Sequence, residues 1–318
     1  GLGAPVVHLD PHRDHRVERD IDPVKVKEIP QNQPLDLLLK KLDADLKDSQ
    51  AQGSGSLENA EFTVKFYTEI SDTDPAQSGK EAVRSWVFKT DKSGTIKFPK
   101  DYFVSGDDFY YASDGKTVCL PLGTVTVQET KAPAGYHLND TVFVQKITSS
   151  GDGETISVYN APDVEDQIYR GGVKIQKRDL ETSGNTPQGG ATLSGAKFSI
   201  TTLNEQPVVV NGKSYEKDQV VLTLETDQNG LASTASDTLP VGHYRVDEIT
   251  PPTGYLGEGT LSREFDVTKN GEIVDLTGEN TSIFNQIIRG GVKIQKRDAE
   301  TGDATAQGGA TLKDAVFT

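Results

Sequence analysis

A polar side chain ends each of three alternating apolar segments, and this pattern occurs twice along the chain. The residues are Lys177, Glu248 and Asn285 in one set, and Lys41, Glu129 and Asn160 in the other. Because side chains two positions apart on a strand share a face, each of these residues is expected to point into a core with its apolar neighbours. An uncompensated charge in a core is costly, so a matching set in both halves of the chain requires a chemical explanation.

A buried lysine, glutamate and asparagine together could form a covalent Lys–Asn isopeptide bond. Burial lowers the pKa of a lysine and raises that of a glutamate, which supplies a neutral amine and a protonated acid. The amine would attack the Asn amide carbon while the acid polarises the carbonyl and shuttles protons until ammonia leaves. The predicted bonds are Lys41–Asn160 and Lys177–Asn285, with Glu129 and Glu248 as catalytic acids. The alternative is a pair of buried Lys–Glu ion pairs that do not react.

Other reactive residue types lack the partners that a site requires. Cys119 is the one cysteine, and no histidine follows it closely enough to activate its thiol. His8, His12 and His15 could bind zinc together with two nearby aspartates, but no repeat or core fixes their spacing, and a solvated leader is the simpler interpretation. The sequence therefore predicts neither a metal site nor a cofactor.

Internal repeats show which segments must position these residues. Residues 170–193 and 289–312 are nearly identical at an offset of 119 residues. A weaker upstream copy aligns with the first of them at an offset of 136, which falls to 119 after an insertion. The predicted parts are a polar leader at 1–30, a domain at 31–165 with an insertion at 103–116, a domain at 166–288 and the start of a third at 289–318.

Short β-strands are expected to carry these repeats. Brief runs alternate between apolar and polar side chains and are bounded by Gly, Pro, Asn and Asp. Residues 34–46 would also fit an amphipathic helix, but their alignment with the alternating segment around Val173 favours a strand. Two units of this length with many short strands are typical of β-sandwiches, so the predicted fold is all-β.

Taken together, the motifs resemble a known family, the Cna protein B-type domains, which are the SpaA-like repeats of Gram-positive pilins and surface adhesins. The matching motifs are KLD and KRD around Lys41 and Lys177, NAEF and GAKF, the LP-x-G-x-x-x-V-x-E strands that reach Glu129 and Glu248, APAGY and PPTGY, and the final Asn in VYNAP and IFNQ. The resemblance covers residues 31–288. It implies tandem Ig-like sandwiches in which Lys on the first strand bonds Asn on the last, with Glu between them.

The third copy contains a lysine of the same kind. Lys296 lies 119 residues after Lys177, while the corresponding Glu and Asn would lie beyond Thr318. We therefore expect Lys296 to keep a free amine, and the segment around it to be mobile or loosely packed, since a single hairpin is marginal in water.

Charge and hydropathy disfavour several classes of partner. Among 318 residues, 33 Lys and Arg face 48 Asp and Glu, and the formal charge of −15 disfavours nucleic acid and anionic membranes. No apolar run reaches the roughly 18 residues that a membrane span needs. The chain contains no Met, so we expect a segment of a longer protein.

The expected function is that of a structural stalk segment of a pilus or adhesin, extracellular on the bacterial cell surface and anchored to the cell wall through regions outside this segment. Other pilus subunits are then the expected partners. The alternative is a ligand-binding adhesin in which insertion 103–116 contacts a host extracellular-matrix protein or a glycan. We do not expect an enzyme, because no residue set for catalysis on an external substrate is found.

Overall fold

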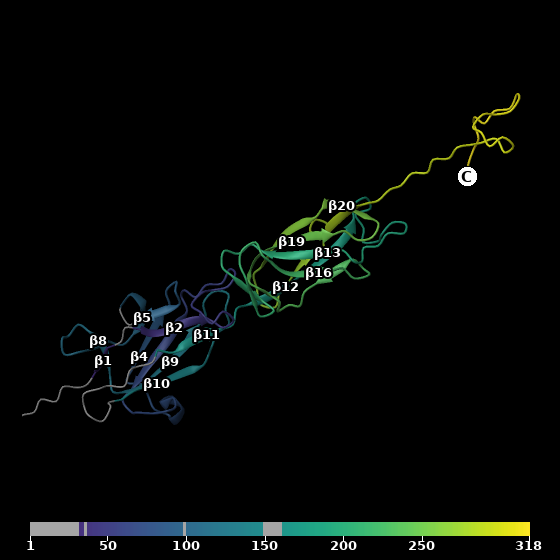
Figure 1. The fold of residues 1–318 in the computed structure, drawn as a ribbon. Helices are drawn as coiled ribbons and strands as arrows, with labels where there is room; N and C mark the ends of the chain where they lie inside the picture. The colour runs from purple at the N-terminus through teal and green to yellow at the C-terminus, as the bar shows by residue number, and fades with distance from the viewer. Residues whose placement is uncertain (1–31, 35–36, 98–99, 149–160) are drawn as a thin grey trace, which may run out of the picture.

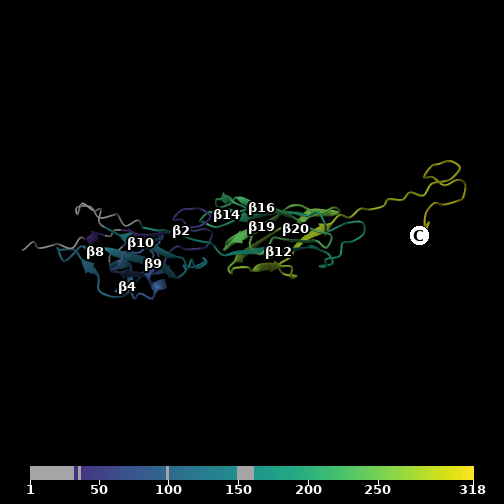
Figure 2. The ribbon, with the colours of Figure 1, turned by 90° about the horizontal axis from the view of Figure 1, so that it is seen from below.

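The structure is a computed structural model that describes residues 32–34, 37–97, 100–148 and 161–318. The predicted leader at 1–30 therefore lies outside the described residues. Two groups of strands lie end to end along one axis, and the segment after the second group leads away from it (Figures 1 and 2). The regular secondary structure of the described chain is almost entirely β-strand, which confirms the predicted fold class.

Among the described residues, eleven strands form the first unit. They are β1 (Asn32–Pro34), β2 (Leu37–Asp43), β3 (Glu61–Tyr67), β4 (Arg84–Lys89), β5 (Thr95–Lys97), β6 (Phe103–Gly106), β7 (Tyr110–Tyr111), β8 (Val118–Pro121), β9 (Gly123–Lys131), β10 (Val142–Ile147) and β11 (Asp163–Asp166). The largest sheet has the order β10-β9-β3-β4-β6, and two smaller sheets have the orders β11-β2-β5 and β1-β8-β7. The predicted boundary after residue 165 falls inside β11.

Twelve strands form the second unit. They are β12 (Arg170–Asp179), β13 (Lys197–Thr202), β14 (Val208–Val210), β15 (Lys213–Tyr215), β16 (Val220–Glu225), β17 (Leu231–Ser233), β18 (Leu239–Pro240), β19 (Gly242–Thr250), β20 (Tyr255–Thr260), β21 (Ser262–Val267), β22 (Ile273–Leu276) and β23 (Ile283–Ile287). One sheet has the order β16-β13-β19-β21. A second, with the order β17-β12-β23-β20, also holds β18 and β22.

Alternation along the strands buries apolar side chains in a main hydrophobic cluster in each unit. In β3 the buried residues are Phe62, Val64 and Phe66, while the residues between them are partly exposed. Removing such large apolar side chains from water is the main favourable term in folding. Residues 37–43 form a strand, as the repeat alignment predicts, rather than part of a helix.

The insertion at 103–116 adds short strands to the first unit. β6 pairs with β4, and β7 pairs with β8. Tyr110 packs against the rings of Phe66 and Trp86, so this aromatic residue belongs to the core, whereas Tyr111 is 42% exposed. Among the described residues, the helical segments are two 3-10 turns, η1 (Pro75–Ser78) and η2 (Lys100–Tyr102), and neither is long enough to cross a membrane.

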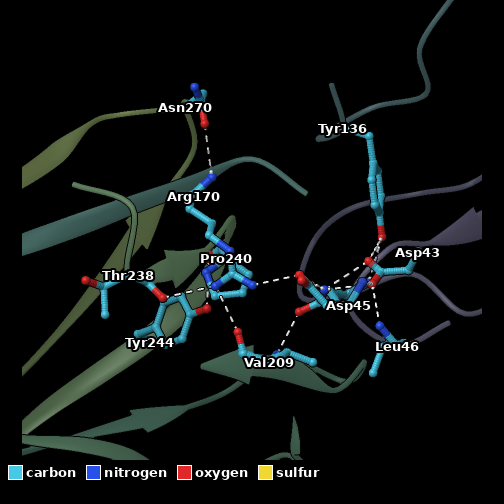
Figure 3. A network of polar contacts seen from close by, with 11 residues as sticks. Asp43, Asp45, Leu46, Tyr136, Arg170, Val209, Thr238, Pro240, Tyr244 and Asn270 are labelled. Atoms are coloured by element: carbon cyan, nitrogen blue, oxygen red, sulfur yellow. Dashed lines mark hydrogen bonds and ion pairs between the residues drawn. The ribbon is translucent and has the colours of Figure 1, made fainter. Parts of the chain in front are cut away.

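A buried carboxylate organises one end of each unit. Asp43 accepts hydrogen bonds from the backbone N–H groups of Asp45 and Leu46, from the side-chain amide of Gln52 and from the hydroxyl of Tyr136 (Figure 3). In the second unit Asp179 accepts the corresponding bonds, including those of Gln188 and Tyr255. We call this arrangement the Asp–Gln–Tyr cluster. Its several donors compensate the desolvation of the carboxylate.

The two units are joined at the Asp–Gln–Tyr cluster of the first. Arg170 donates from one guanidinium nitrogen to Asp45 and from another to the carbonyls of Val209 and Thr238 (Figure 3). Tyr136 packs in one hydrophobic cluster with apolar residues of the second unit, including Val241. Polar and apolar contacts together therefore hold the two units in a defined orientation.

Replacing Tyr136 by Phe should lower stability. The hydroxyl of Tyr136 donates to Asp43 at 2.7 Å and accepts from the backbone N–H of Gln52 at 3.0 Å. Its loss leaves two buried groups short of a partner, at a cost of about 1–3 kcal/mol. Denaturant unfolding should show a lower midpoint for Tyr136→Phe, and an unchanged midpoint for the control Tyr111→Phe at an exposed site. Equal midpoints for both variants would contradict the assigned role of the cluster.

Candidate functional site

A tight turn fixes the backbone of each predicted lysine. The motifs TDKSG and TDQNG each begin with Thr-Asp and end in a glycine with φ near +70°, Gly94 and Gly230. The carbonyl of Gly94 accepts from the N–H of Lys41 at 2.6 Å, and that of Gly230 accepts from Lys177 at 2.7 Å. A Cβ on Gly94 would lie 2.7 Å from the carbonyl oxygen of Lys41, so the approach requires glycine.

A β-bulge places each predicted glutamate. Phe62 on β3 lies opposite Glu129 on β9, and Phe198 on β13 lies opposite Glu248 on β19. In both pairs the register shifts by one residue beside the glutamate. Bulges re-aim side chains, and here each one lies next to the residue that must face the lysine across the core. The NAEF and GAKF motifs supply the opposing phenylalanines.

The three predicted residues of the second unit meet in its core. The Lys177 ammonium nitrogen lies 3.1 Å from Glu248 Oε1, and Asn285 Nδ2 donates to Glu248 Oε2 at 2.7 Å. The side chains of Lys177 and Glu248 are 0% and 1% exposed, and Asn285 is fully buried as well. Glu248 thus links the amine and the amide, as the strand pattern predicts.

The first unit contains a similar cluster with a different third residue. Lys41 Nζ lies 2.7 Å from Glu129 Oε1 and also forms an ion pair with Asp166. All three side chains are fully buried. The predicted partner Asn160 lies outside the described residues. Asp166, which the sequence interpretation did not single out, therefore completes the described cluster.

Strand register shows that Asp166 corresponds to Asn285. β11 runs parallel to β2 with Val164 opposite Lys41, and β23 runs parallel to β12 with Ile283 opposite Lys177. Asp166 and Asn285 each lie two residues further along the same face. The offset between them is 119, the same as between Glu129 and Glu248, and this constant offset is the signal that could have identified Asp166.

Burial shifts the protonation of both clusters toward neutral groups. It lowers the pKa of Lys177 to about 8 and raises the pKa of Glu248, although the attraction between these two groups opposes both changes. Burial likewise raises the pKa of Asp166 to about 7, against the attraction of Lys41. Burial therefore favours the neutral amine of Lys177 and the protonated forms of the Glu248 and Asp166 carboxyl groups.

The polar atoms of these clusters are incompletely hydrogen-bonded. Among the described residues, every deeply buried side-chain nitrogen or oxygen without a well-formed hydrogen bond belongs to one of the two clusters. These atoms are Lys41 Nζ, Glu129 Oε1, both Asp166 carboxylate oxygens, Lys177 Nζ, Glu248 Oε1 and Asn285 Oδ1. Buried polar groups are normally satisfied, so this concentration points to a chemical role.

The remaining candidates lie elsewhere. Lys296 is exposed, and the described segment 289–318 contains no strand. Cys119 is buried, and burial raises its pKa, which favours the unreactive thiol. His8, His12 and His15 lie outside the described residues.

The fold and the paired clusters define a class of protein: tandem β-sandwich domains with a buried Lys–Glu–Asn or Lys–Glu–Asp set in each. A family model for the SpaA prealbumin-like fold domain matches residues 43–162 and 171–282. These two matches include most of the chain, and the protein belongs to this family. No curated protein sequence matches the chain.

Three of the solved structures that are similar to this chain are a TIE protein, a minor pilin and a pilus adhesin fragment. The Bacillus anthracis TIE protein is 26% identical over 78% of this chain, with a TM-score of 0.40. The minor pilin GBS52 of Streptococcus agalactiae is 15% identical over 76% of this chain and 88% of its own, with a TM-score of 0.28. A C-terminal fragment of the pilus adhesin SpaC from Lactobacillus rhamnosus GG is 14% identical, over 81% of this chain and 98% of its own, with a TM-score of 0.34. The chain spans 33% of the length of the TIE protein.

Amine labelling of the folded protein should separate the three aligned lysines. Lys41 and Lys177 are fully buried, whereas Lys296 is exposed. An amine-reactive reagent followed by peptide mapping should therefore modify Lys296 and spare the other two. Protection of Lys296 equal to that of Lys177 would mean that segment 289–318 is covered in solution.

Proposed function

We propose that the chain is a stalk segment of a bacterial cell-surface pilus or adhesin, stiffened by the isopeptide bonds Lys41–Asp166 and Lys177–Asn285. The observation that carries this proposal is the pair of buried clusters that hold, among the described residues, all the deeply buried side-chain atoms without a well-formed hydrogen bond. A bond between the amine and the carboxyl or amide carbon turns two costly buried groups into one neutral amide. An inert buried ion pair would leave that cost in place.

In the second unit the reaction expels ammonia. Neutral Lys177 attacks the side-chain carbonyl carbon of Asn285, and protonated Glu248 donates a proton to the carbonyl oxygen. The lysine nitrogen loses a proton to the glutamate, which passes it to Nδ2. The C–Nδ2 bond then breaks and ammonia leaves, while the hydroxyl proton returns to Glu248 as the carbonyl re-forms. Glu248 contacts the amine and accepts from Nδ2 of the amide in the structure, so a half-turn of the Asn285 amide group would bring its unpartnered Oδ1 to the acid.

In the first unit the same steps on Asp166 expel water. The acceptor must be a protonated carboxylic acid, because a carboxylate resists attack by an amine. The raised pKa of Asp166, about 7, supports this state near neutral pH. Glu129, 2.7 Å from the amine, takes the role of Glu248. We therefore propose Asp166 as the acceptor of the first unit, in place of Asn160.

Each bond would join the first and last strands of its unit. In the second unit it connects positions 285 − 177 = 108 residues apart, and in the first 166 − 41 = 125 apart. By analogy with disulfides, closing loops of this size stabilises a fold by about 4–5 kcal/mol through the restricted unfolded chain. Each bond forms once and within the chain, so the protein is a structural element and not an enzyme.

The family and its solved relatives support an extracellular place for this segment. The names of the similar structures describe pilins and a pilus adhesin, which suggests other pilus subunits as partners and a cell-wall-anchored assembly. The acidic net charge of −15 would keep a crowded surface array soluble.

A second candidate function is recognition of a host protein or glycan by the first unit. A cavity of about 630 Å³ lies at the insertion and is lined by Gly106 and by aromatic and charged residues, namely Arg84, Phe103, Asp107, Asp108, Phe109 and Tyr111. The guanidinium of Arg84 lies 3.7 Å from the ring centroid of Tyr110 and is held at the rim of this cavity. Aromatic and charged groups of this kind suit a polar ligand such as a sugar.

Intact mass should reveal both bonds. The Lys41–Asp166 bond removes water, about 18 Da, and the Lys177–Asn285 bond removes ammonia, about 17 Da, so the folded protein should weigh about 35 Da less than its sequence. Peptide mapping after denaturation should then yield one cross-linked pair that contains Asp166 and one that contains Asn285. A full sequence mass would sink the proposal, and a cross-link at Asn160 would reassign the first unit.

Replacing the glutamates should block the bonds without unfolding the units. Glu248→Gln keeps the size and a hydrogen-bonding group but removes the proton shuttle, so Lys177 and Asn285 should remain separate and the mass loss should fall by about 17 Da. Glu129→Gln should do the same to Lys41 and Asp166. Mass spectrometry and thermal unfolding measure both effects, with Glu264→Gln, an exposed site on β21, as the matched control. Bond formation at the normal rate in Glu248→Gln would show that Glu248 has another role.

A further inference from the structure

The end of the first unit is a shaped receptor for the second. The backbone N–H groups of Gly53 and Ser54 donate to the carbonyls of Pro207 and Val241, each at 3.0 Å. The side-chain oxygen of Gln52 accepts from the N–H of Val209 at 2.7 Å. A Cβ on Gly53 would lie 2.1 Å from the carbonyl oxygen of Val241, so the approach of the two backbones requires glycine there.

Gln52 couples this receptor to the cluster beneath it. Its amide nitrogen donates to both carboxylate oxygens of Asp43, which turns its oxygen toward the second unit. Arg170 completes the contact by bonding Asp45 on one side and the carbonyl of Val209 on the other. Three of these hydrogen-bonding groups therefore meet the extended segment Pro207–Val209, and the fourth, the N–H of Ser54, meets the turn at Val241.

The same groups recur at the far end of the second unit. The repeat alignment pairs each group with its counterpart: Asp43 with Asp179, Asp45 with Glu181, Gln52 with Gln188, Gly53 with Gly189, Ser54 with Gly190, Gly135 with Gly254, Tyr136 with Tyr255 and Arg170 with Arg289. Their internal bonds recur too. Gln188 donates to both oxygens of Asp179, and Arg289 bonds Glu181. The N–H of Ile288 donates to the carbonyl of Gly254, as that of Tyr169 does to Gly135.

At this far end the receptor is open. Gln188, Gly189, Gly190, Gly254 and Arg289 line a cavity of about 500 Å³. The side chain of Arg289 is 66% exposed, whereas that of Arg170 is 19% exposed in the filled junction. A Cβ on Gly189 would meet no atom within 4 Å. The far end of the second unit therefore has the same internal bonds as the end of the first unit, but no neighbouring unit of the described chain contacts it in the structure.

We propose that this cavity is a docking socket for a further prealbumin-like domain joined through residues 289–318. The occupant supplies an extended aliphatic segment equivalent to Pro207–Val209 and a turn equivalent to Val241. Its carbonyls accept from the N–H groups of Gly189 and Gly190 and from Arg289, and one of its N–H groups donates to Gln188. The tandem domains then stack through one repeated interface.

Two features of the chain favour this occupant over a second copy of the same protein. Residues 289–312 repeat the segment 170–193, which connects the filled junction to the second unit. The first unit cannot offer the same surface, because the residues aligned with the Gln-Pro-Val-Val-Val segment at 206–210 read Ile-Ser-Asp-Thr-Asp at 70–74. Those acidic residues would also face the carboxylates of the socket, Asp179 and Glu181.

An extended chain tests the socket. Residues 194–288 are appended after Leu312, which completes a third unit from the sequence of the second. Amide hydrogen exchange is then compared with that of the 318-residue chain. Gly189 and Gly190 should exchange at least about ten-fold more slowly in the extended chain, and as slowly as Gly53 and Ser54. Protection of the core strands in the added unit shows independently that this unit has folded.

A glycine substitution supplies the matched variant. Gly189→Ala places a methyl group where the carbonyl of the docked turn must lie, so it should abolish the protection at Gly190 while the added unit stays folded. Gly212→Ala is the control, since Gly212 also has a positive φ, of 75°, and also has no atom within 4 Å of an added Cβ. It should leave the protection intact.

Two results would overturn the proposal. In one, the added unit folds but Gly189 and Gly190 exchange as fast as before. In the other, these amides become protected in the 318-residue chain as its concentration rises, which would assign the socket to a second copy of the protein.

Discussion

A lysine enclosed with carboxyl groups between two sheets is the constraint on which the rest of each unit depends. The ammonium of Lys41 or Lys177 has no access to water, and an uncompensated ion there would cost several kcal/mol. The TD-x-x-G turn, the bulge beside the glutamate and the parallel pairing of first and last strands all bring compensating groups to that one point. Local motifs that look unrelated in the sequence therefore serve a single electrostatic requirement.

The strand pattern predicted more of this site than a fold assignment alone would give. Period-two alternation placed Lys41, Lys177, Glu129 and Glu248 in the cores because a strand leaves only two faces. The bulge next to each glutamate does not change the face on which the glutamate lies, because the extra residue comes after the glutamate along the strand. The amphipathic-helix alternative for residues 34–46 was wrong, because residues 37–43 pair with β5 and β11 as a strand, and this pairing outweighs the local helix propensity.

The third residue of the first cluster shows where alternation alone is insufficient. Asn160 ends an alternating run and has the expected chemistry, whereas Asp166 follows a short, charged segment that reads as a linker. The parallel register of β11 on β2 places Asp166 at the position of Asn285, which is why we propose it as the acceptor, and pairing between strands more than a hundred residues apart is invisible to a local pattern. The junction was missed for the same reason, because the bond from Val209 to Gln52 spans 157 positions.

Site and junction lie on one continuous path through the chain. Lys41 and Asp43 are two residues apart on β2, so the strand that carries the amine also carries the carboxylate of the Asp–Gln–Tyr cluster. Asp166 is followed after four residues by Arg170, where β12 begins and leads to Lys177. With both bonds formed, tension enters along β2, crosses from Lys41 to Asp166, follows β12 to Lys177 and crosses to Asn285. The intervening strands of each sandwich then lie outside the stretched path. Their packing serves to assemble the clusters and the junction, while the covalent path resists extension.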